Sequence, residues 1–132
     1  MRKKTELTEQ QAVIEWCEWM SAQYPELKTI YHITNEGKRS KSQGAALVAA
    51  GLKKGVPDLC LPVSRGGYNA LYIEMKKSRK EHCTKEQQKF QILLAEQGNF
   101  CCVAHGFDEV KEYIERYIKM PKGRVVYDKR RS

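Results

Sequence analysis

Two short stretches decide how this chain folds: Gly55-Val56-Pro57-Asp58-Leu59 and, a little downstream, Leu71-Tyr72-Ile73-Glu74-Met75-Lys76. In the second stretch apolar and polar side chains alternate, which is the period of a β-strand with one buried face. Successive side chains of a strand point to opposite faces, so Glu74 and Lys76 share one face, about 7 Å apart along the chain. The first stretch places Asp58 directly after a proline, at the start of a short apolar segment. An acid and a cation on one face, beside an acid on a neighbouring strand, suit the binding of a metal ion and a phosphate.

The segment between these stretches predicts that the two acids meet. Arg65-Gly66-Gly67-Tyr68-Asn69 has the composition of a turn that joins two antiparallel strands in a hairpin. Two ionised carboxylates within ~4–6 Å repel each other unless a cation lies between them. Mg²⁺ fills such a position with one or two carboxylates, water and phosphate as ligands. On these residues alone a second interpretation stays open, in which Asp58 ends a turn and Glu74 and Lys76 form a solvated strand face.

The remaining segments predict a small mixed sheet flanked by helices. Thr8-x-x-Gln11 and Thr84-x-x-Gln87 have the form of capping boxes, which open helices. The expected elements are a helix over 9–22, a strand at 31–33, a basic turn over 35–41, a helix over 43–50 with Gly51 as C-cap, a strand that begins at Pro57-Asp58 and ends at Pro62, a strand over 70–76, a helix from Thr84 to Gly98, a strand over 100–104 and a helix capped by Asp108. This order, α-β-α-β-β-α-β-α, is typical of an α/β domain.

Two acids of the first predicted helix lie on different faces. Val13, Trp16, Cys17 and Met20 form its apolar stripe. At 100° per residue Glu9 falls inside this stripe, while Glu15 points almost opposite to it. An acid on the face that packs against the sheet indicates a role beyond solvation.

Length and composition limit the class of protein. The chain of 132 residues suits one domain, which we expect over 1–120, followed by a basic tail over 121–132. The sequence has 24 Lys and Arg against 16 Asp and Glu, and this net charge of +8 favours a polyanionic partner. No apolar run approaches the ~20 residues of a membrane-spanning helix. Five cysteines without Cys-x-x-Cys spacing disfavour zinc fingers and disulfide scaffolds and fit a reduced, cytoplasmic setting.

Basic clusters are the candidate contacts to nucleic acid. A cluster of this kind is also typical of a solvated face, but beside a phosphate-cleaving centre it would hold the DNA backbone without reading sequence. Binding would then weaken steeply with salt. The candidates are Lys38, Arg39, Lys41, Lys77, Arg79 and Lys80.

Taken together, Gly55-Val56-Pro57-Asp58, Ile73-Glu74-Met75-Lys76 and Thr84-x-x-Gln87 resemble the virus-type replication-repair nuclease (VRR-NUC) domain. This family is a branch of the PD-(D/E)xK nuclease superfamily. The similarity runs from about Glu9 to Ile118, nearly the whole chain, as in the compact standalone members of phages and bacteria. The resemblance implies a restriction-endonuclease-like core of αβββαβα type.

The resemblance also implies roles for individual residues. Asp58 and Glu74 match the metal-binding acids of the family, the backbone carbonyl of Met75 would join them, and Lys76 matches the catalytic lysine. Gln87 matches a glutamine near the active site, although it would equally complete the capping box of Thr84. The first-helix glutamate of the family is Glu9 or Glu15, and the apolar stripe favours Glu9.

The expected function is therefore a Mg²⁺- or Mn²⁺-dependent DNA endonuclease. The resemblance implies selectivity for DNA structure, such as branched DNA or four-way (Holliday) junctions, and leaves open whether the pathway is DNA repair, recombination or phage replication. It also implies a homodimer, which a small domain needs in order to cut two strands symmetrically. The alternative from another class is a non-catalytic DNA-binding protein of the same fold. A restriction-type endonuclease is disfavoured because the chain has no room for a separate target-recognition domain.

Overall fold

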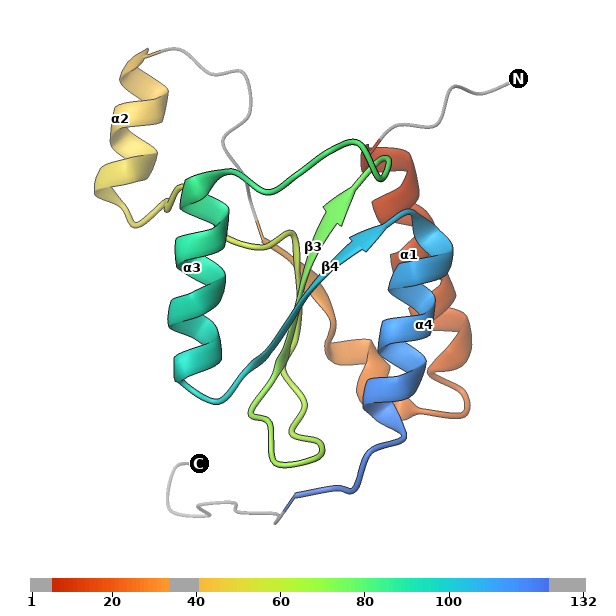
Figure 1. Cartoon of the computed structure of the whole chain (residues 1–132). Helices are drawn as coiled ribbons and strands as arrows, with labels where there is room; N and C mark the ends of the chain where they lie inside the picture. Colours follow the sequence, from red (N-terminus) through yellow and green to blue (C-terminus); the bar gives the residue numbers. More distant parts are fainter. Residues whose placement is uncertain (1–5, 34–40, 124–132) are drawn as a thin grey trace, which may run out of the picture.

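A four-stranded sheet forms the centre of the computed structural model, which describes residues 6–33 and 41–123 (Figure 1). Its strands are β1 (Tyr31–His32), β2 (Leu59–Leu61), β3 (Leu71–Lys76) and β4 (Phe100–His105), and they lie side by side in this order. The pairs β1–β2 and β2–β3 are antiparallel, whereas β3 and β4 are parallel. The expected mixed sheet and the expected hairpin between β2 and β3 are both confirmed.

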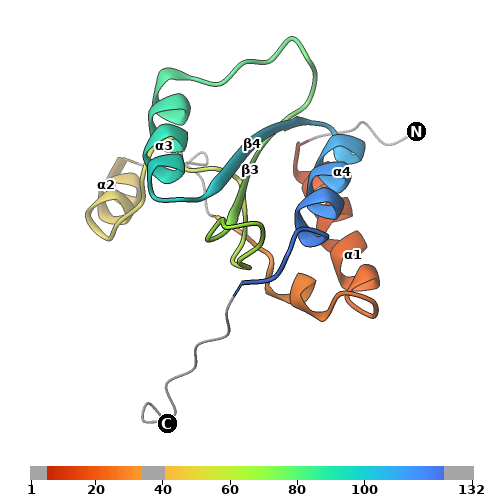
Figure 2. The same cartoon turned by 60° about the horizontal axis from the view of Figure 1, so that its bottom comes forward.

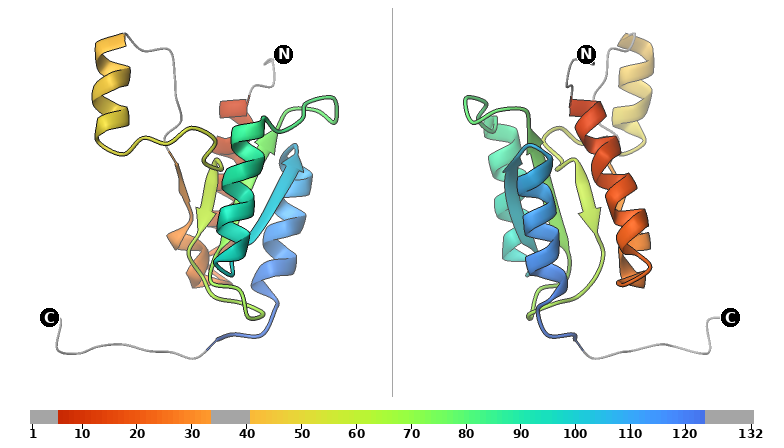
Figure 3. Two further views of the ribbon diagram at one scale, coloured as in Figure 1. Left: turned by 60° about the vertical axis from the view of Figure 1, so that its left-hand side comes forward. Right: turned by 90° about the vertical axis from the view of Figure 1, so that its right-hand side faces the viewer.

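Helices cover the sheet unequally. Helix α1 (Glu6–Met20), the 3₁₀-helix η1 (Pro25–Thr29) and α4 (Phe107–Ile118) lie on one face, and α3 (Lys85–Glu96) lies on the other. Figures 2 and 3 show this layering from other sides. Helix α2 (Lys41–Ala49) stands apart from the sheet in every view. None of the helices in the described part of the chain has both the length and the apolar character that a membrane-spanning segment requires.

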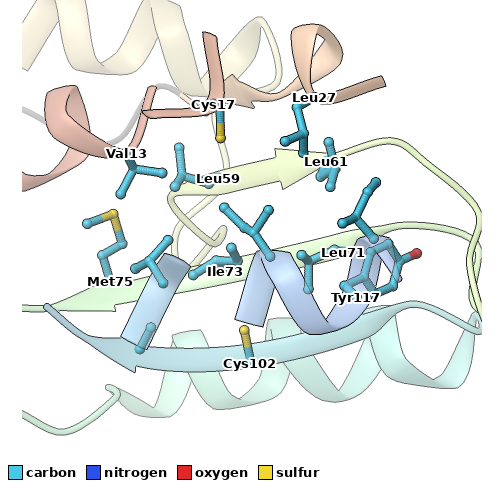
Figure 4. Packing of buried hydrophobic residues seen from close by; sticks show 14 residues of the cluster. Val13, Cys17, Leu27, Leu59, Leu61, Leu71, Ile73, Met75, Cys102 and Tyr117 are labelled. Atoms are coloured by element: carbon cyan, nitrogen blue, oxygen red, sulfur yellow. The ribbon is translucent and has the colours of Figure 1, made fainter. Parts of the chain in front are cut away.

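The apolar face of β3 forms the middle of the core. Leu71, Ile73 and Met75 are at most 1% exposed and pack towards α1 and α4, where Val13 and Cys17 meet them (Figure 4). Burying one such side chain contributes about 1.5–3 kcal/mol, so this face alone fixes which side of β3 points inwards. Tyr72, Glu74 and Lys76 therefore face the side of α3, as the alternation predicts.

The register of the hairpin brings the two predicted acids together. Leu59 pairs with Ile73 and Leu61 pairs with Leu71 in the antiparallel ladder. One step further along the same register, Asp58 lies opposite Glu74. Residues directly opposite on neighbouring antiparallel strands have Cβ atoms about 4.5–5.5 Å apart, so the two carboxylates emerge close together on one face.

Several helix ends match the sequence pattern. The capping box at Thr84 is present, and the main-chain hydrogen bonds Leu52 N–H to Leu47 O and Asn99 N–H to Leu94 O close α2 and α3. These are the outer bonds of Schellman motifs, in which Gly51 and Gly98 adopt positive φ.

Two predicted caps are wrong. Thr8 lies inside α1, which begins at Glu6, so Thr8 is not an N-cap. Asp108 lies in the first turn of α4 and not at its cap, because Gly106 with φ of 90° occupies the N-cap position and the helix begins at Phe107. An acid in the first turn is still favoured by the helix dipole. Pro25 is the first residue of η1, where its fixed φ suits the first helical turn.

Candidate active site

The Asp58 side chain is bound to the neighbouring strand. It is 7% exposed, and its Oδ2 accepts a hydrogen bond of 2.7 Å from the backbone N–H of Met75. The carbonyl of Asp58 accepts from the N–H of Ile33 at 2.8 Å, which ties this residue to the end of β1 as well. In a strand the N–H and C=O of one residue point to the same edge, so the carbonyl of Met75 faces the Asp58 side of β3. Asp58 is thus held on both sides by main-chain groups.

Glu74 and Lys76 form a buried pair on the same face. Glu74 is 3% exposed and Lys76 is 8% exposed, and Glu74 Oε2 lies 4.0 Å from Lys76 Nζ. A buried ion costs several kcal/mol unless it is paired and hydrogen-bonded. With both carboxylates ionised, Asp58, Glu74 and Lys76 carry one net negative charge in a confined space. A divalent cation with a preference for oxygen ligands fits this set of donors.

Gln87 both completes the capping box and contacts Lys76. Its Oε1 accepts from Lys76 Nζ at 2.9 Å and from the N–H of Thr84 at 2.9 Å. In return the backbone N–H of Gln87 donates to Thr84 Oγ1 at 3.1 Å. One amide oxygen therefore closes the capping box of α3 and fixes the ammonium group of Lys76. The sequence indicates the cap but not the link to Lys76, because that link depends on how α3 packs on the sheet.

Tyrosines extend the polar face away from the acids. Cys60 pairs with Tyr72 in the hairpin and with Tyr31 on the other side. The hydrogen bond between the side chains of Tyr31 and Cys60 raises the pKa of Tyr31 to about 12, and burial raises the pKa of Tyr72. Both phenols therefore remain protonated near neutral pH. They provide a neutral surface beside the acids and no general base.

The linker after β3 is attached to α4. The guanidinium of Arg79 pairs with Oε1 of Glu109, and Oε2 of Glu109 accepts the N–H of His105 at 2.5 Å. The His105 N–H, together with Arg79, holds the pKa of Glu109 below its usual range. This arrangement fixes the middle of the linker that connects Lys76 to α3. It also balances the charge of Arg79, which the sequence had assigned to DNA contacts.

The other predicted DNA contacts lie around this linker or outside the described residues. Lys77 and Lys80 are exposed, as phosphate contacts require. Lys41 is the first residue of α2. Lys38 and Arg39 lie outside the described residues, as does the tail beyond residue 123.

The structure separates Glu9 from the other two acids. The carboxylate oxygens of Glu9 lie 3.9 and 4.0 Å from the position that a Cβ on Gly106 would occupy, at the turn between β4 and α4. The N–H of Gly106 donates to the carbonyl of Lys76 at 3.0 Å, so Glu9 lies near the end of β3 but approaches from the side of α1. Over residues 6–33 and 41–123 no three His, Cys, Asp or Glu side chains are gathered closely enough to hold a metal. Glu15 is exposed, as its place opposite the stripe predicts.

A groove next to Gln87 was not predicted from the sequence. Lys53, Lys54 and Gly55 line one side of it, and Thr84 and Gln87 line the other, around a volume of about 380 Å³. The feature of the sequence that could have indicated this groove is the pair of lysines directly before Gly55-Val56-Pro57-Asp58.

A mixed sheet with two acids and a lysine at the end of a hairpin defines a nuclease-like α/β fold. Residues 5–108 match the sequence model of the VRR-NUC domain. A solved structure of a VRR_NUC domain protein is similar over 92% of this chain and 94% of that chain, with 30% sequence identity and a TM-score of 0.77. No significant match was found among curated proteins. The chain belongs to the VRR-NUC domain family, a nuclease-type family.

Substitution of Gln87 tests its double role, with Thr84 as the matched control. Gln87→Ala removes the acceptor for Lys76 and half of the capping box, whereas Thr84→Ala removes only the other half. We expect both variants to lower the free energy of unfolding by about 0.5–2 kcal/mol, measured by urea denaturation. In a nuclease assay Gln87→Ala should have a lower kcat than the wild type, whereas Thr84→Ala should keep the kcat of the wild type. Equal activity of the two variants would show that Gln87 acts only as part of the helix cap.

Proposed function

We propose that this protein is a divalent-metal-dependent DNA endonuclease that hydrolyses phosphodiester bonds. The observation that carries the proposal is the buried set of Asp58, Glu74 and Lys76 at one end of the β2–β3 hairpin. Membership of a nuclease-type family supports it. Buried charges of this kind contribute little to stability on their own. We therefore attribute their presence on an otherwise well-packed strand to the proposed hydrolysis of phosphodiester bonds.

The donor atoms identify the residues that would hold the metal. Asp58 and Glu74 would bind Mg²⁺ or Mn²⁺ with the carbonyl of Met75. Glu9 is proposed as a further ligand, which would have to leave its position beside Gly106 to reach this set. The bound ion would polarise the phosphoryl group and lower the pKa of the attacking water. Burial of the acids keeps competing water away from their oxygens, which strengthens their electrostatic interaction with a cation.

Lys76 acts on the substrate. Its ammonium group has three donors, and the hydrogen bond to Gln87 occupies one of them. The remaining donors would contact the attacking water or a non-bridging oxygen of the scissile phosphate, where negative charge grows in the transition state. A donor held in place before the reaction needs no reorganisation at that moment, which is the source of its effect on the rate.

The kind of contact available supports DNA binding that does not depend on base sequence. Lys77 and Lys80 are exposed beside the site and would bind phosphates, which position a duplex but carry no base information. A net charge of +8 adds long-range attraction to any polyanion. The substrates proposed are branched DNAs, including four-way junctions.

Lys76→Ala separates binding from cleavage. With Mg²⁺ or Mn²⁺ present, we expect at least a ~100-fold loss of kcat on a panel of linear, flap and four-way-junction DNAs, since a single such donor has this effect elsewhere. DNA affinity, measured by fluorescence anisotropy in EDTA, should change little. Lys28→Ala, on η1, is the control with the same loss of charge. If Lys76→Ala still cuts, the centre of catalysis lies elsewhere, and a wild type that binds every DNA but cuts none would identify a non-catalytic binding protein.

Metal titration distinguishes the acids. In isothermal calorimetry with Mn²⁺, Asp58→Asn and Glu74→Gln should abolish binding to the free protein, because each removes a charged ligand. Glu9→Gln should weaken Mn²⁺ binding, while Glu15→Gln, an identical change on the exposed face of the same helix, should not. Weakening by Glu15→Gln alone would reassign the first-helix ligand.

A homodimer is proposed because apolar surface on α2 and α3 has no cover within the described chain. Leu47 and Val48 on α2 are 37% and 54% exposed, and Ile92 and Leu93 on α3 are 58% and 61% exposed. An isolated helix as short as α2 is marginal in water, so α2 needs a packing partner. A second copy would present the same exposed apolar side chains and provide this partner by two-fold symmetry.

Charge placed on this surface should separate the subunits. We expect the wild type to sediment with twice the mass of one chain, and Val48→Lys or Ile92→Lys to shift it towards the monomer in analytical ultracentrifugation. Trp19→Lys changes a side chain that is 75% exposed on α1, at the opposite face of the sheet, and should leave the dimer intact. A monomeric wild type at micromolar concentration would refute the proposed dimer.

A further inference from the structure

The groove beside the acids has two walls that belong to different parts of the chain. One wall is the segment from Lys53 to Val56, which runs directly into Pro57 and Asp58. The other is the beginning of α3, with Thr84, Glu86 and Gln87. Because Gln87 also accepts from Lys76 Nζ, the groove shares a residue with the active site. An occupant of the groove would therefore lie next to Gln87, the hydrogen-bond partner of Lys76.

The two walls are in close contact, and a glycine makes this possible. Gly55 has φ of 87°, and a Cβ at this position would lie 2.5 Å from the carbonyl oxygen of Glu86. No real Cβ approaches a backbone oxygen so closely, so the chain can pass α3 here only as glycine. The contact holds the two lysines that precede Gly55 at the edge of the site.

The charges of this wall are available to a ligand. Lys53 and Lys54 are exposed, and within the described part of the chain neither takes part in an ion pair, unlike Arg79. Glu86 also lines the groove and carries the opposite charge. Two cations against one acid leave the groove positive, while the neighbouring set of Asp58, Glu74 and Lys76 is negative. The groove thus attracts an anion next to a site that attracts a cation.

We infer that this groove binds a backbone phosphate of the DNA strand being cut, with Lys53 and Lys54 as its contacts. The inference rests on the proposed function and adds a substrate subsite to it. Lys53 precedes Asp58 by five residues, which span at most ~17 Å of extended chain. Phosphates of one strand recur every ~3.4 Å along the duplex axis, so those that flank the scissile bond lie within this distance. These lysines position the strand and do not take part in the reaction.

The test compares two double variants with the same loss of charge. Lys53→Gln/Lys54→Gln alters the groove, and Lys28→Gln/Lys119→Gln alters exposed lysines on η1 and after α4, away from the groove. DNA affinity is measured in EDTA between 50 and 200 mM salt, so that cleavage plays no part. Each lost phosphate contact should reduce the slope of log K against log salt by about 0.9 on duplex DNA. We expect the groove variant to lose about tenfold in affinity and to show a slope smaller by about 0.9, the value for one phosphate contact. The control variant should show neither change.

A change of opposite sign and a cleavage assay complete the design. Glu86→Gln should tighten DNA binding, while Glu96→Gln, at the far end of α3, should not. In the presence of Mn²⁺ the groove variant should show a raised KM with kcat nearly unchanged, the pattern of a contact made equally in the ground and transition states. Equal behaviour of the groove and control variants would overturn the inference while leaving the nuclease intact. A wild type that neither binds nor cuts DNA would instead overturn the proposed function itself.

Discussion

The hydrogen bond from the Met75 N–H to the Asp58 carboxylate is the contact on which the candidate site depends. It links the residue before β2 to the polar end of β3, and so continues the hairpin one step beyond its ladder. Without it, Asp58 would belong to a loop whose conformation the strands do not determine. With it, two acids from segments separated by a turn become neighbours on one face. The Met75 carbonyl points to the same edge of the strand as this N–H, and so it faces Asp58 as well.

Strand β3 carries a conflict between stability and chemistry. Its apolar face packs Leu71, Ile73 and Met75 against α1 and α4, and this burial determines the orientation of the strand. The opposite face is also largely buried, yet it holds Glu74 and Lys76. Replacement of buried ion pairs by apolar residues is often neutral or stabilising in proteins. The apolar face thus supplies the stability that lets the polar face retain the charged groups Glu74 and Lys76.

Local patterns predicted most of the fold. The alternation in β3, the capping box at Thr84 and the glycine at position 98 each act over a few residues, and each is found where the sequence places it. The caps at Thr8 and Asp108 failed because several residues near a helix start satisfy the same rule. Which of these residues becomes the N-cap depends on the conformation of the neighbouring backbone, as at Gly106 before α4.

The long-range contacts of the site could not be predicted from the sequence. The angular position of Glu9 on α1 was readable, but its distance from Asp58 depends on how α1 lies across the sheet, and its carboxylate is found beside Gly106. The pairing of Arg79 with Glu109 joins a linker to a helix thirty residues later, and no local rule anticipates it. The link from Gln87 to Lys76 is of the same kind. Periodicity assigns a side chain to a face, whereas packing decides which side chains meet.

Helix α3 shows how closely the fold and the site are coupled. None of its residues is fully buried, so apolar packing holds it weakly against the sheet. Its first turn is instead fixed by the hydrogen bond between Gln87 and Lys76 and by the approach of Gly55 to the carbonyl of Glu86. Both attachments lie at the edge of the candidate site. Any ligand that draws Lys76 away from Gln87 would therefore loosen the start of α3, and a substrate that contacts both walls of the groove would hold it in place.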